Sequence, residues 1–92
     1  MKDWAESDLA WELAELVAPV LADRDRDELY VTIGSGSSYA AIDTLLQMIV
    51  QRRLPVSVAL VARIDVWSNA YVHSGDAPRL HELLDAIRSL PH

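Results

Sequence analysis

The sequence predicts an all-α protein of four to five helices, in which an acidic amphipathic N-terminal helix precedes two stacked helical hairpins. Apolar residues recur with the 3.6-residue period of a helix over most of the chain. Turn-forming residues separate the periodic segments, and the second half repeats the pattern of the first at an offset of 38 residues. A small α/β fold is the alternative, because two segments also fit a strand pattern.

Length and composition predict one domain. The chain has 92 residues, of which 51% are hydrophobic and 24% charged. Such a chain buries roughly 60–65% of the surface that it exposes when unfolded, which is enough for a single core. We therefore expect one helical domain over 1–92, with the N-terminal helix in 1–22, the first hairpin in 25–53 and the second in 55–91.

The N-terminal helix is expected to run from Asp3 to Leu21 and to be buried on two faces. One face carries the residues Leu9, Leu13, Leu16, Val17 and Val20. The nearly opposite side carries Trp4, Trp11 and Ala18, with Ala14 beside them and the acids Asp8, Glu12 and Glu15 along the border. Pro19 should kink or end this helix, because proline lacks a backbone donor.

The run Asp23 to Asp27 alternates acids with arginines and is predicted to be a solvated connector. The next secure helix spans Tyr39 to Arg53. Its apolar stripe consists of Ile42, Leu45, Leu46, Ile49 and Val50. This width of stripe is typical of a central helix.

Two segments fit either a helix or a strand. Val56 to Val72 alternates like a strand as far as Val66, but the same segment places apolar residues on a helical arc, and a strand of that length is unusual. We favour the helix, with Pro55 in its first turn. Leu29 to Ile33 would then be a lone strand without a partner for its backbone hydrogen bonds, so a helix is favoured there too.

The last predicted helix begins after Asp76, which can cap it, and carries Pro78 in its first turn. Its apolar face consists of Leu80, Leu83, Leu84, Ile87 and Leu90. At the offset of 38 residues this face aligns with that of the 39–53 helix, and Gly34 to Ser38 aligns with Val72 to Asp76. Both halves therefore follow the order helix, turn, helix.

Charge restricts the class of partner. The net charge is −6, and the whole excess lies in residues 1–28, so this surface should repel nucleic acid and anionic membranes and attract a basic or mixed partner. The chain has no cysteine, its N-terminus lacks the pattern of a signal peptide, and its longest apolar stretch is too short to span a membrane. We expect a cytoplasmic protein without enzyme activity, cofactor or metal.

The Gly/Ser stretch Gly34 to Ser38 has two interpretations. After a strand, Ser35, Ser37 and Ser38 could hold the phosphate of a small molecule at the start of the next helix. Over about ten residues the stretch resembles the Ser-rich loop of sugar-isomerase-type phosphosugar-binding domains, although the chain is too short for that doubly wound fold. The favoured interpretation is the turn of a helical hairpin.

The tryptophan stripe is the favoured binding surface. Trp4 and Trp11, with the acids Asp8, Glu12 and Glu15, are predicted to contact a protein partner, because tryptophan is enriched among residues that dominate binding energy. The same stripe could instead be covered by the chain's own fold or by a second copy in a homodimer. We therefore predict a protein-interaction module, with a purely structural homo-oligomer as an alternative.

One family resemblance bears on biological context. The elements that carry it are Ile33-Gly34-x-Gly36, Ala41-Ile42, Leu45-Leu46, Trp67, Ala70-Tyr71 and Arg79-Leu80. Over roughly residues 28–84 the chain resembles small uncharacterised proteins encoded by bacteriophages of mycobacteria and related actinobacteria. The resemblance implies a compact helical accessory protein that binds a host protein in the host cytoplasm. It implies no catalytic residues.

Overall fold

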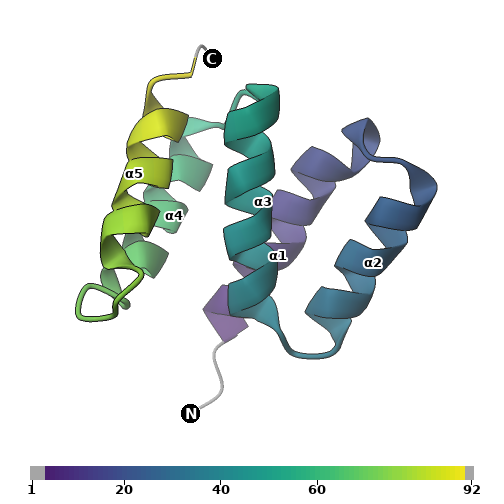
Figure 1. The fold of residues 1–92 in the computed structure, drawn as a ribbon, viewed down its shortest axis with the longest axis horizontal. Coiled ribbons are helices and arrows are strands. Elements are labelled where there is room, and N and C mark those ends of the chain that lie inside the picture. The colour runs from purple at the N-terminus through teal and green to yellow at the C-terminus, as the bar shows by residue number, and fades with distance from the viewer. Residues whose placement is uncertain (1–3, 91–92) are drawn as a thin grey trace. The chain divides into compact units, whose positions relative to one another are not determined.

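The computed structural model describes residues 4–90, with side chains from Glu6 onward, and is helical throughout (Figure 1). Its elements are α1 (Trp4–Val17), the 3-10 turn η1 (Ala18–Val20), α2 (Asp23–Gly34), α3 (Ser38–Arg52), α4 (Val58–Asn69) and α5 (Ala77–Arg88). Residues 4–90 contain no strand. The predicted all-α class with five helices is thus confirmed, and the small α/β alternative is wrong.

Internal contacts divide the chain into two compact units, Met1–Leu45 and Leu46–His92. The N-terminal unit contains α1, η1, α2 and the first half of α3, and the C-terminal unit contains the rest of α3 with α4 and α5. Each unit has its own set of buried apolar side chains. The single domain and the stacking of the two hairpins stay predictions.

Helix α1 is buried over one continuous half of its circumference. Leu9, Leu13 and Val17 lie on the predicted apolar face, and Ala10 and Ala14, with Ala18 of η1, extend that face. A second buried face at Trp11 was predicted and is wrong, because Trp11 is exposed. The helix ends at Val17, where the chain tightens into η1 around Pro19. Val20 was expected in the core but is 42% exposed, because the 3-10 turn changes the angle between successive side chains, and Leu21 is buried instead.

Helix α2 begins within the run that was predicted to be a connector, so that prediction is wrong. Asp23 and Asp25 lie in its first turn, where carboxylates interact favourably with the free backbone N–H groups. Arg26 pairs with Asp23 one turn away. Leu29 and Ile33 are buried on the face that packs with α1, so 29–33 is helical.

The turn between α2 and α3 is a Schellman motif. The Gly36 N–H donates to the Ile33 carbonyl at 3.1 Å, and the Ser37 N–H donates to the Thr32 carbonyl at 3.2 Å. Gly36 has a φ of +92°, which glycine adopts without the steric cost of a Cβ. Ser37 then accepts from the Ala41 N–H and so opens α3. The Gly/Ser stretch is therefore a hairpin turn, as favoured.

Helix α3 ends with the same pair of hydrogen bonds. The Arg53 N–H donates to the Val50 carbonyl and the Leu54 N–H to the Ile49 carbonyl. Arg53 takes the position that Gly36 holds in the first motif and has a φ of +55°. A side chain in this left-handed conformation costs about 1–2 kcal/mol.

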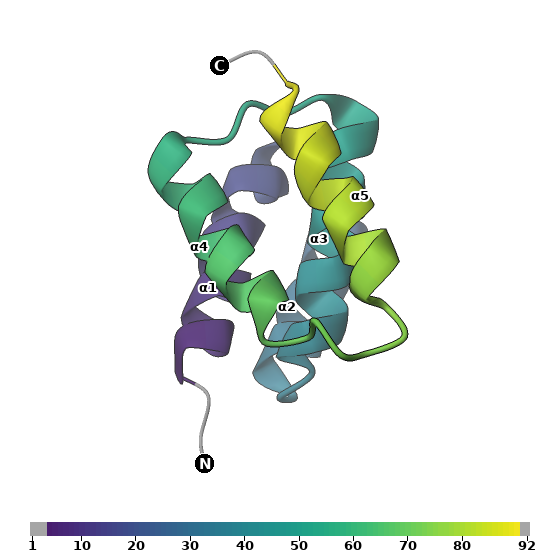
Figure 2. The same ribbon diagram turned by 90° about the vertical axis from the view of Figure 1, so that its left-hand side faces the viewer.

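The second hairpin consists of α4 and α5, which pack side by side (Figure 2). Ser57 caps α4 by accepting from the Leu60 N–H at 3.2 Å, so the helix begins after Pro55 rather than around it. Ile64 and Trp67 of α4 are buried in the C-terminal unit, and so are Leu80, Leu84 and Ile87 of α5.

Two polar features accompany this hairpin. Asp76 precedes α5 as predicted, but its side chain makes no cap bond, and it pairs with Arg79 at 3.3 Å instead. Arg88 of α5 reaches Asp65 of α4, also at 3.3 Å. Such half-exposed pairs add at most about 1 kcal/mol, so packing dominates the stability of the hairpin.

The two Schellman motifs predict opposite effects of paired substitutions. Gly36→Ala should lower the free energy of unfolding by about 1 kcal/mol, because no atom crowds an added Cβ and only the backbone conformation opposes it. Arg53→Gly should raise it by a similar amount. Urea denaturation of both variants measures the effects, and two changes of the same sign would contradict this geometry.

Candidate functional site

Among the side chains of α1 that the structure describes, Trp11 is the large aromatic one at the surface. Its side chain is 41% exposed, whereas Trp67 of the C-terminal unit is only 7% exposed. The Trp11 ring lies against Tyr30 of α2, with ring centroids 5.6 Å apart and an interplanar angle of 32°. One side of the ring is therefore supported by the fold, and the other is accessible to a ligand or partner.

Three of the four acids on α1 lie on one side of this tryptophan. Asp8 and Glu15, one turn before and after Trp11, and Glu12, the next residue, are all exposed. On the other side of Trp11, Ala10 and Ala14 are fully buried. We call Trp11, Tyr30, Asp8, Glu12 and Glu15 the acidic aromatic surface. This surface includes four of the five residues that were predicted to bind a partner. The fifth is Trp4, whose side chain the structure does not describe.

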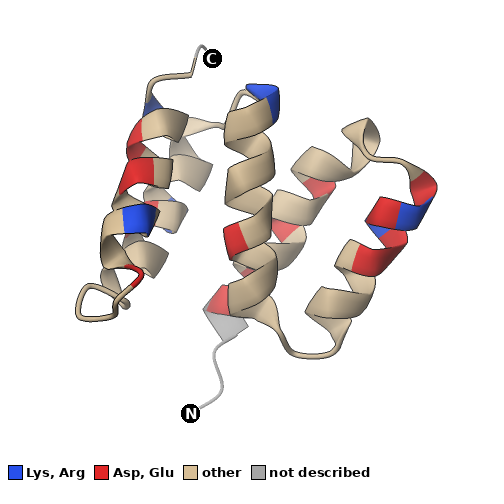
Figure 3. Cartoon of the chain, in the orientation of Figure 1, with Lys and Arg blue, Asp and Glu red and all other residues tan. Residues whose placement is uncertain are grey.

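Charge is divided unequally between the two units. Residues 1–45 carry a net charge of −7 and residues 46–92 a net charge of +1. The acids gather on α1 and α2, as the red segments of these helices show (Figure 3). The acidic aromatic surface therefore lies in a field that attracts cations and basic segments.

The sequence pattern does not identify Tyr30 as a surface residue. Tyr30 lies in 29–33, a segment whose pattern fits either a helix or a strand. Once 29–33 is helical, Tyr30 falls beside the buried pair Leu29 and Ile33, at the edge of the face that packs with α1. That helical position is the signal that could have identified it.

The candidate anion-binding serines have other roles in the turn. The Ser35 hydroxyl donates to the Thr32 carbonyl at 2.9 Å, and the Ser37 N–H is used to close α2. Ser38 is buried in the first turn of α3. In an α/β protein, a phosphate-binding loop at this position would follow a strand. In this structure the segment before the loop is the helix α2. The geometry therefore favours a structural role for Ser35, Ser37 and Ser38.

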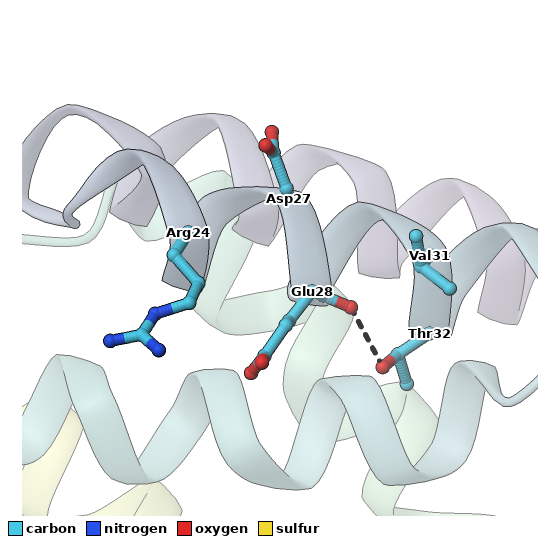
Figure 4. Close-up of a pocket in the computed structure, with 5 residues that line it drawn as sticks. All are labelled: Arg24, Asp27, Glu28, Val31 and Thr32. Atoms are coloured by element: carbon cyan, nitrogen blue, oxygen red, sulfur yellow. Dashed lines mark hydrogen bonds between the residues drawn. The ribbon is translucent and has the colours of Figure 1, made fainter.

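A shallow groove of about 670 Å³ lies along α2 (Figure 4). It is lined by Arg24, Asp27, Glu28, Val31 and Thr32, all from this one helix. The Thr32 hydroxyl is bonded to the Glu28 carbonyl at 2.9 Å, and the groove opens widely to solvent.

Two further searches of the described residues concern other classes of function. No group of three or more His, Asp or Glu side chains within 4–90 is arranged to bind a metal ion. In the same part of the chain, no helix is both long enough and apolar enough to cross a membrane.

Comparison with protein-family models, curated proteins and solved structures finds no match to this chain. The resemblance to phage accessory proteins stays a prediction.

The environment of Trp11 predicts selective quenching of its fluorescence. In a Trp4→Phe/Trp67→Phe variant, where Trp11 is the remaining tryptophan, caesium should quench more strongly than iodide at low ionic strength. A carboxylate about 8 Å away changes the local concentration of a monovalent ion about twofold before screening. The difference between quenching by caesium and quenching by iodide should become smaller when Glu12 and Glu15 are changed to Gln. Equal quenching by both ions at low salt would contradict the acidic environment.

Proposed function

We propose that this chain is a protein-interaction module that binds a basic segment of a partner protein through the acidic aromatic surface. The observation that carries the proposal is the exposed Trp11 ring, held against Tyr30 and bordered by three carboxylates. A supported tryptophan offers apolar contact area at little cost in side-chain entropy. The carboxylates favour Lys or Arg in the partner.

The partner's chemistry follows from this arrangement. An Arg or Lys side chain can place its charged group over the Trp11 ring while a neighbouring basic residue pairs with Glu12 or Glu15. The net charge of −7 on residues 1–45 would also accelerate association with a basic partner at low salt. Nucleic acid and anionic membranes are disfavoured as partners by the same charge.

The resemblance to actinobacteriophage proteins supplies the context that we propose to test. In that context the chain acts in the host cytoplasm, and its partner is a host protein. It works by binding, without a cofactor.

Removal of the Trp11 ring tests the proposal. Tagged wild-type chain and Trp11→Ala are used to capture proteins from an actinobacterial lysate, and the affinity of each captured protein is then measured. For the true partner, Trp11→Ala should cost about 2 kcal/mol, roughly a thirtyfold loss of affinity. Charge reversal with Glu12→Lys and Glu15→Lys should also weaken this partner, and added salt should weaken its binding to the wild type.

Val31→Ala is the matched control, since Val31 is an exposed apolar residue of the same unit but lies outside the acidic aromatic surface. It should bind the partner like the wild type. If every captured protein binds Trp11→Ala as tightly as the wild type, the proposal is wrong.

A further inference from the structure

The ring pair of Trp11 and Tyr30 is bordered by a carboxylate on its α2 side as well as by those on its α1 side. Asp27 lies one helical turn before Tyr30, and residues three apart on a helix are neighbours, with about 5–6 Å between their Cβ atoms. The buried residues Leu29 and Ile33 lie on the other side of Tyr30 from Asp27. Asp27 therefore lies at the outer edge of the ring pair on α2.

The charge of Asp27 is available to a ligand. Asp27 is exposed, and its carboxylate makes no ion pair or hydrogen bond with another residue in the part of the chain that the structure describes. Its side chain points to the opposite side of α2 from those of Arg24 and Glu28 (Figure 4). Asp23, by contrast, is paired with Arg26, and the two charges neutralise one another.

The carboxylates on the two sides of the ring pair are too far apart for one basic group. Glu12 and Glu15 lie on the side of Trp11 away from the buried alanines of α1. The axes of packed helices are about 8–10 Å apart, and the carboxylates of α1 and α2 lie outside the rings, so at least about this distance separates them. A guanidinium that donates to one side at about 2.8 Å leaves the other side out of reach. Two basic residues are needed to pair with both.

We propose that Asp27 pairs with a second basic residue of the partner segment and so determines which basic segments bind. The inference rests on the proposed function, in which a first basic residue pairs with Glu12 or Glu15 and lies over Trp11. The segment then crosses from α1 to α2 over the rings instead of running along α1. In an extended segment three residues span about 10 Å, so the pattern that fits is two basic residues separated by two others.

Two short peptides with blocked ends test this pattern. One has two arginines separated by two alanines, and in the other the second arginine is replaced by citrulline, which has a similar shape but no charge. Backbone amide chemical shifts of the isotope-labelled chain measure the dissociation constant of each peptide. The wild type should bind the two-arginine peptide about threefold more tightly, as is typical of one exposed ion pair. Asp27→Asn should lose most of this difference.

Asp25→Asn is the matched control, because it removes the same charge from the same helix. Asp25 is exposed and five residues from Tyr30, so it lies about 140° around the helix from that ring. Asp25→Asn should keep the difference between the two peptides. Circular dichroism checks that both variants remain helical.

Trp11→Ala separates this inference from the proposed function, because it should weaken the binding of both peptides. If it does so, the role of Asp27 alone is wrong when the wild type binds the two peptides equally, when Asp27→Asn keeps their difference, or when Asp25→Asn loses it to the same extent. If neither peptide binds the wild type at about 10 mM, or if Trp11→Ala binds both like the wild type, the inference and the proposed function are both wrong.

Discussion

The burial of one half of the circumference of α1 is the constraint on which the N-terminal unit depends. Leu9, Leu13 and Val17 supply apolar area, and the small Ala10 and Ala14 beside them are fully buried, so a larger side chain there would need space that close packing does not leave. Each fully buried leucine contributes about 1.5–3 kcal/mol. Trp11 lies next to these alanines on the helix, and its ring rests on Tyr30 at the edge of the packing between α1 and α2.

The proposed surface follows from two physical features of the N-terminal unit. The acidic aromatic surface combines one exposed ring with carboxylates, which suits a basic partner whose binding weakens in salt. The net charge of −7 on residues 1–45 adds to this preference for a basic partner.

The sequence predicted the helices well where a helix has one apolar face and one polar face. The periodicity of Ile42 to Ile49 and the position of Pro19 identified α3 and the end of α1. Val56 to Val66 was ambiguous because α4 is apolar on several sides, and periodicity measures only the contrast between faces. The start of α2 was missed because charged residues suit both a connector and the first turn of a helix.

The details of caps and surfaces depend on backbone angles and packing that sequence patterns do not contain. Ser57 is extended, with a ψ of 154°, so its hydroxyl accepts from the backbone, whereas Asp76 has a helical ψ of −7° and makes no side-chain cap bond. The most direct test of the role of α1 is the unfolding free energy of Ala14→Met against Ala40→Met on the exposed side of α3. Ala14→Met should lose about 1–3 kcal/mol and Ala40→Met less than about 0.5 kcal/mol. Equal stabilities of the two variants would contradict the close packing of α1 at Ala14.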